Sequence, residues 1–121
     1  MKPEIRNLTG HPVVLKGADS EYVEIPPDSI GKSWLETEDS IEATIDVGGV
    51  SINVTRISNA GIVGLPPFQP GVLLLVSKYV IMESNRGDLI TPFKLVRNQK
   101  GDVVSAGGVR MNERSRSLWI R

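Results

Sequence analysis

The clearest structural signal in the chain lies in residues 41–55, which read Ile41-Glu42-Ala43-Thr44-Ile45-Asp46-Val47-Gly48-Gly49-Val50-Ser51-Ile52-Asn53-Val54-Thr55. Apolar and polar residues alternate on both sides of Gly48-Gly49, which is the period of a strand with one buried face. A Gly-Gly pair favours a two-residue turn with positive φ at both positions, and the twist of that turn matches the twist of the strands. This stretch therefore predicts a β-hairpin with one apolar face in a core and one face in solvent.

Further strands are indicated on both sides of this hairpin. Residues 12–15 and 22–25 flank a polar Gly-Asp-Ser turn and predict a second hairpin, and residues 93–97 and 102–106 flank an Asn-Gln-Lys-Gly turn and predict a third. Residues 72–76 are apolar at every position. Such a run is typical of a strand that is buried on both faces.

Two connecting segments complete the predicted fold. Ser77 is suited to cap a short helix over residues 78–84, and residues 58–71 hold three prolines and three glycines, which predicts an irregular surface loop. We expect a mainly β fold: a small antiparallel barrel or sandwich of seven or eight short strands, with one short helix after the central apolar strand. We expect residues 1–111 to form a single β-rich domain, and residues 112–121 to form a basic tail that serves as a docking or interaction arm.

Composition limits the chemistry that this chain can perform. With 121 residues and no cysteine, it has the size of one domain and holds no disulfide, thiolate metal site or cysteine nucleophile. Residues 1–50 carry 4 Lys or Arg and 10 Asp or Glu, and residues 51–121 carry 10 and 4, so the halves have net charges of −6 and +6. The two halves can neutralise each other within a protomer or meet head to tail between subunits. Alternatively, the basic half can bind an anionic partner.

The chain shows no targeting or membrane segment. The N-terminus has no apolar core of signal-peptide length, and no stretch reaches the roughly 18 apolar residues that a membrane span needs. We therefore expect a cytoplasmic protein without a membrane partner.

Signatures of catalysis are absent from the sequence. His11 is the single histidine, which excludes a multi-histidine metal centre, and neither a Gly-x-Ser-x-Gly elbow nor a glycine-rich phosphate loop occurs. A triad of Ser77, His11 and Asp88 can be imagined, but nothing marks Ser77 as a nucleophile. No cofactor is expected. Trp119 in the basic tail is too isolated an aromatic residue for a base-stacking platform, so nucleic acid is not the expected partner.

Several motifs resemble those of a family of small phage- and prophage-associated proteins that carry no assigned activity. The chain has Asn7-Leu8-Thr9-Gly10-His11-Pro12 where the family opens with Asn-Leu-Thr-Pro-His, and later motifs follow in the same order at residues 63–66, 76–80 and 86–92. Gly10 stands in place of the usual proline. The resemblance implies a phage context, hence the host cytoplasm, and a set of recurring polar residues: Asn7, Thr9, His11, Ser77, Arg86 and Asp88.

Those polar residue types predict either a structural hydrogen-bond network or a ligand pocket, because burying Arg, Asp or His is costly unless each is paired. The first hypothesis is a non-catalytic phage-type accessory protein that forms a homo-oligomer. It would bind a phosphate-bearing or nucleotide-like ligand through Arg86 and its neighbours, and in this way sequester a signal molecule of host defence. The alternative is a structural or interaction module that contacts a host protein through residues 58–71 and 112–121. The third hypothesis is an enzyme that acts on a small metabolite and whose pH profile is set by His11.

Overall fold

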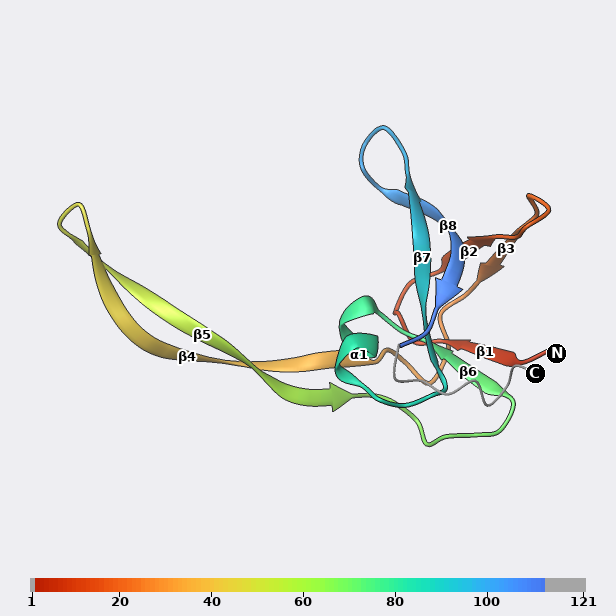
Figure 1. Ribbon diagram of the computed structural model, residues 1–121, viewed down its shortest axis with the longest axis horizontal. Helices are drawn as coiled ribbons and strands as arrows, with labels where there is room; N and C mark the ends of the chain where they lie inside the picture. The colour runs from red at the N-terminus through yellow and green to blue at the C-terminus, as the bar shows by residue number, and fades with distance from the viewer. Residues whose placement is uncertain (1, 113–121) are drawn as a thin grey trace.

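The structure, a computed structural model, describes residues 2–112 and contains eight strands and one short helix among them (Figure 1). The prediction of a mainly β fold with seven or eight strands and one helix is confirmed. The elements are β1 (Glu4–Asn7), β2 (Val13–Lys16), β3 (Tyr22–Ile25), β4 (Trp34–Val47), β5 (Val50–Val63), β6 (Val72–Leu75), α1 (Lys78–Glu83), β7 (Leu89–Arg97) and β8 (Val103–Arg110).

Six strands form one barrel-like sheet in the order β1-β6-β7-β8-β2-β3, and β4 and β5 form a separate two-stranded sheet. The predicted hairpins β2–β3 and β7–β8 are antiparallel, but β1–β6, β6–β7 and β2–β8 are parallel, so the sheet is mixed. Parallel neighbours need a crossover connection, and α1 provides it between β6 and β7. A strand pattern predicts faces and not strand direction, which explains why the sequence indicated a wholly antiparallel arrangement.

Strand β6 is the centre of the core, as its unbroken apolar run predicted. Because side chains alternate along a strand, Leu73 and Leu75 enter one buried cluster with Val13 and Ile90, whereas Leu74 enters another. That second cluster lies beneath α1 and is made of Leu8, Leu74, Val76, Val80, Ile81 and Leu89. Each fully buried leucine contributes about 1.5–3 kcal/mol relative to an exposed one, so this strand holds both clusters together.

Helix α1 begins where the sequence places it. The Ser77 hydroxyl accepts a hydrogen bond of 3.3 Å from the backbone N–H of Val80 and thereby satisfies one of the free N–H groups of the first turn. Val80 and Ile81 face the core, while Tyr79 and Met82 are exposed. Within residues 2–112, no helix has the length and hydropathy needed to cross a bilayer.

Strands β4 and β5 form a long hairpin, here called the arm, that extends away from the six-stranded sheet (Figure 1). Gly48 and Gly49 occupy its turn with φ of 58° and 82°, so the predicted two-residue turn is confirmed. The prediction that one face of this hairpin is buried is wrong for the protomer, since every residue from Glu36 to Gly61 is exposed. Within residues 2–112, no second layer covers either face of the arm along this stretch.

The irregular loop after the arm is shorter than the sequence predicted. Residues 58–63 belong to β5, so the predicted irregular loop is limited to residues 64–71. The prolines and glycines that suggested a loop are concentrated after Val63, whereas Gly61 is accommodated within the strand at a φ of 114°. The predicted docking tail falls almost wholly at residues 113–121, outside the described part of the chain.

Candidate functional site

Asn7 closes the barrel-like sheet. It is 1% exposed, and its amide nitrogen donates to the carbonyl oxygens of His11, at 2.8 Å, and Ile25, at 2.9 Å. Since β1 and β3 are the two edges of the six-stranded sheet, the bond to Ile25 joins the edges. The backbone N–H of Asp28 also donates to the carbonyl of Asn7, at 2.8 Å. Both amide hydrogens of Asn7 are therefore used to hold the fold.

Thr9 and His11 belong to the same network. The amide oxygen of Asn7 accepts from the backbone N–H and the hydroxyl of Thr9, at 3.0 and 2.6 Å, which leaves no polar atom of the Asn7 amide unpaired. The His11 ring is exposed, and its Nδ1 lies 3.0 Å from the carbonyl oxygen of Pro12. Gly10 has a φ of 87°, which a proline ring cannot adopt. Glycine at position 10 therefore permits a backbone conformation that proline would exclude.

Arg86 and Asp88 form a two-point ion pair. The Nε and Nη2 atoms of Arg86 donate to the two carboxylate oxygens of Asp88 at 3.0 and 2.7 Å, and Nη1 donates to the carbonyl of Pro66 at 2.9 Å. Asp88 is 3% exposed, so Arg86 supplies the opposite charge that a buried carboxylate needs. The pair ties the loop after the arm to the segment before β7. A phosphate would have to displace Asp88 to reach the same fork.

The six residues named from the sequence therefore serve the fold in three places. Asn7, Thr9 and His11 gather at the end of β1; Arg86 and Asp88 lie between α1 and β7; and Ser77 caps α1. Of the two interpretations open from the sequence, these contacts favour structural hydrogen bonding. Ligand binding by the six residues stays a prediction.

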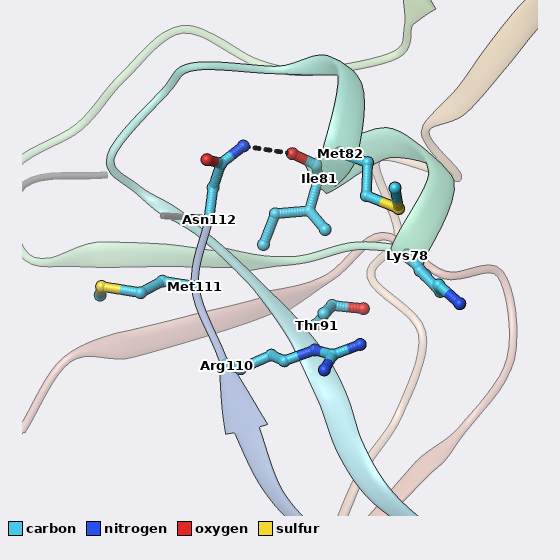
Figure 2. Close-up of a pocket in the computed structure, with 7 residues that line it drawn as sticks. All are labelled: Lys78, Ile81, Met82, Thr91, Arg110, Met111 and Asn112. Atoms are coloured by element: carbon cyan, nitrogen blue, oxygen red, sulfur yellow. Dashed lines mark hydrogen bonds between the residues drawn. The ribbon is translucent and has the colours of Figure 1, made fainter. Parts of the chain in front are cut away.

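A pocket of about 330 Å³ lies elsewhere, between α1 and the ends of β7 and β8 that meet near it (Figure 2). None of the six residues above lines it. Thr91 stands opposite Arg110 in the β7–β8 ladder, and Asn112 holds the chain after β8 against the helix by donating to the carbonyl oxygens of Ile81, at 2.6 Å, and Ser84. The lining residues are Lys78, Ile81, Met82, Thr91, Arg110, Met111 and Asn112.

Positive charge dominates this pocket. Within residues 2–112, no acidic residue lines it, and neither Lys78 nor Arg110, both exposed at its rim, forms an ion pair. The Arg110 guanidinium stacks over the ring of Phe93 at 4.8 Å, which orients it without neutralising it. Figure 2 shows the Thr91 hydroxyl, the Arg110 guanidinium and the Lys78 ammonium on the same side of the pocket. Two cations beside a hydroxyl donor form a recognition set for an anion.

Sequence reasoning did not find this pocket. Lys78 and Arg110 are 32 positions apart, and neither is one of the recurring polar residues of the recognised motifs. The one available signal was the excess of basic residues in the second half of the chain, one explanation of which was an anionic partner. Because the two side chains come together only through the β7–β8 ladder and the crossover helix, their proximity follows from topology.

Neither a protein-family model, nor a curated protein, nor a solved structure matches this chain. Among residues 2–112, no three acidic or histidine side chains are grouped as a metal ion would require. The resemblance to a phage family therefore stays a prediction.

Proposed function

We propose that this chain is a non-catalytic binding protein that captures a small phosphate-bearing or nucleotide-like anion in the pocket lined by Lys78, Thr91 and Arg110. The observation that supports it is the pair of cations at the rim: among residues 2–112, they have no acidic partner and no carboxylate lines the pocket they face. A pocket of about 330 Å³ lies in the size range of small-molecule sites. The function class is the one that the sequence suggested, but the residues that support it are different.

The pocket favours binding over catalysis. Among residues 2–112, its lining offers no imidazole or carboxylate to act as a general base, and His11 lies among the residues that join β1 to β2. The apolar side chains of Ile81, Met82 and Met111 suit the face of a base or another flat group, while the cations suit phosphate. If the gene is phage-borne, capture of a nucleotide-like signal would withdraw it from a host defence response.

The test is ligand-dependent stabilisation of the full chain. Inorganic phosphate, mononucleotides, and cyclic mono- and dinucleotides are added separately, and the unfolding temperature and the binding heat are measured at low and high salt. We expect at least one of them to raise the unfolding temperature, and the Kd to weaken as salt rises. Absence of any shift across this set would refute the proposal.

Two charge-neutralising changes locate the site. Lys78→Gln with Arg110→Gln should weaken binding at least tenfold, whereas the matched pair Lys16→Gln with Lys32→Gln, exposed cations outside the pocket lining, should leave it unchanged. This placement of the ligand would be contradicted if Lys78→Gln with Arg110→Gln left the affinity unchanged, or if only variants of Arg86 lost binding.

A second candidate function is a protein-interaction module, and the exposed apolar face of the arm favours it. Affinity capture from a host lysate with the full chain, compared with a variant whose arm face carries Ile45→Glu and Ile52→Glu, tests this function. A host protein recovered in equal molar amount by the unaltered chain and lost with the variant supports it, while recovery of no host protein counts against it.

A further inference from the structure

One face of the arm is apolar from Ala43 to Val54 and, within residues 2–112, has nothing packed on it. Residues opposite each other in an antiparallel pair share a face, and the register places Ala43 with Val54, Ile45 with Ile52 and Val47 with Val50. The intervening pairs, Thr44 with Asn53 and Asp46 with Ser51, form the other, polar face. The five larger side chains on the apolar face remain between 39% and 57% exposed.

An arm of this kind is not expected to stay uncovered. A two-stranded hairpin alone is marginally stable in water, and in the described residues 2–112 only the base of the arm packs against other elements. Ile62 packs against the core cluster beneath α1, and the Asn59 side chain donates to the Glu83 carboxylate at 2.7 Å. Across residues 2–112, 21 large hydrophobic residues are exposed and 11 hydrophobic residues are buried. On the arm these exposed residues are contiguous, and a contiguous exposed apolar patch is typical of a surface that meets another chain.

Charge shows which surface fits the arm. The arm, residues 34–63, holds five acidic residues and one arginine, a net charge of −4. The β7–β8 hairpin, residues 89–110, holds four basic residues and one acidic residue, a net charge of +3. This second hairpin also exposes a set of large apolar side chains: Phe93, Leu95, Val96, Val103, Val104 and Val109.

We infer that the apolar face of the arm of one copy docks on the exposed β7–β8 hairpin of a second copy. Summed over each whole hairpin, pairing of two arms would bring −4 against −4, whereas docking of an arm on β7–β8 brings −4 against +3, so the net charge of the hairpins favours the second arrangement. The arm and the β7–β8 hairpin of one chain extend in different directions, the arm to the left and β7–β8 toward the top in Figure 1, and the contact therefore joins two molecules. The −6 and +6 halves of the sequence are then neutralised head to tail between subunits.

The first test compares two faces of the same hairpin. Ile45→Glu with Ile52→Glu adds two charges to a directly opposed pair on the apolar face, and Thr44→Glu with Asn53→Glu adds the same two charges to the neighbouring pair on the polar face. Light scattering after gel filtration should show an assembly for the unaltered chain and for the polar-face variant, and a monomer for the apolar-face variant. Far-UV circular dichroism checks that both variants remain folded.

Three outcomes of that comparison would overturn the inference. The first is that the unaltered chain is monomeric at about 100 µM, a concentration at which contacts with micromolar Kd are populated. The second is that the assembly survives Ile45→Glu with Ile52→Glu. The third is that both variants remain folded and disrupt the assembly equally.

The second test identifies the docking partner, and it is free of background because the chain has no native cysteine. Ile52→Cys in the arm and Val104→Cys in β8 are purified as separate chains, mixed, and treated with a short thiol-reactive crosslinker. Crosslinks between the two different variants should exceed those between two copies of either variant. Predominant crosslinking between two copies of the Ile52→Cys chain would mean that arms pair with arms and would refute the inference.

A charge exchange provides a further control. Lys94→Glu with Lys100→Glu should weaken the assembly at least tenfold, and adding Glu38→Lys with Asp39→Lys in the arm should restore most of the loss, because the signs are again opposite. Weakening without any recovery in the fourfold variant would count against the pairing of these two surfaces.

Discussion

Strand β6 and the outer part of the arm both carry closely spaced aliphatic residues, yet Leu74 is 2% exposed and Ile45 is 50% exposed. Strand β6 has a hydrogen-bonded neighbour on each side, and a cluster of side chains covers each of its faces. Within residues 2–112, the two strands of the arm pair only with each other. The comparison teaches that an apolar pattern identifies the face that will be buried, but the number of neighbouring elements decides whether the burial happens within one chain.

The largest expected difference between the two regions concerns core volume. Leu75→Ala, at a residue that is 0% exposed, should lower the free energy of unfolding by about 2–5 kcal/mol, because it removes buried methyl groups and leaves a cavity. The matched truncation in the arm is Ile45→Ala, which should cost far less at concentrations too low for assembly, because half of that residue is already in solvent. Urea denaturation followed by circular dichroism measures both, and similar losses would mean that the arm is part of the cooperative core.

The next difference concerns the ion pairs. Asp88→Ala leaves the Arg86 guanidinium, whose side chain is 28% exposed, without its two-point partner, and should cost about 2–3 kcal/mol. The arm has a pair of similar geometry, in which Arg56 donates to the two carboxylate oxygens of Glu42 at 2.9 and 2.7 Å, but both residues are exposed. Glu42→Gln should leave the thermal midpoint of the protomer almost unchanged, since water screens exposed pairs. Equal shifts in the two variants would contradict this contrast.

A third difference concerns asparagines. Asn7→Ala removes the link between the two edges of the sheet and leaves buried partners unpaired, so it should cost about 1–3 kcal/mol and speed hydrogen exchange at the end of β1. Asn53→Ala, on the polar face of the arm, should change stability by less than about 0.5 kcal/mol. Hydrogen exchange in β1 that is unaffected by Asn7→Ala would show that the sheet closes without this side chain.

The smallest expected effect is electrostatic. The hydrogen bonds from Arg56 hold the pKa of the Glu42 carboxyl below its usual value of 4.5. Because the pKa in the folded chain lies below that in the unfolded chain, this contact stabilises the arm above pH 4.5 and is lost as the pH falls through the lowered pKa. NMR titration of Glu42 should show the lowered pKa, and Arg56→Gln should return it toward 4.5. An unchanged Glu42 pKa in that variant would exclude Arg56 as its cause.

Local features of this fold were predictable because their causes lie close together in the sequence. The Gly48-Gly49 turn follows from backbone sterics, and Ser77 caps α1 because its hydroxyl reaches an N–H three residues later. The run from Val72 to Val76 indicated burial on both faces, which the two clusters confirm. Each of these needs only local geometry and residue type.

The candidate site was less predictable. The importance of Arg86 and Asp88 could be inferred from their chemistry, but their mutual pairing follows from coordinates. Lys78 and Arg110 carried no local signal, because a cation on a surface looks the same in sequence whether or not a pocket lies beside it.

The sequence by itself determined the β class, the turns, the helix start and the apolar face of the arm, since each depends on the periodicity or sterics of neighbouring residues. Tertiary structure alone decided that β6 and not the arm is enclosed, that Asn7 joins the sheet edges, and that two distant cations meet at one pocket. These depend on strand order and crossover, which bring together residues far apart in the chain.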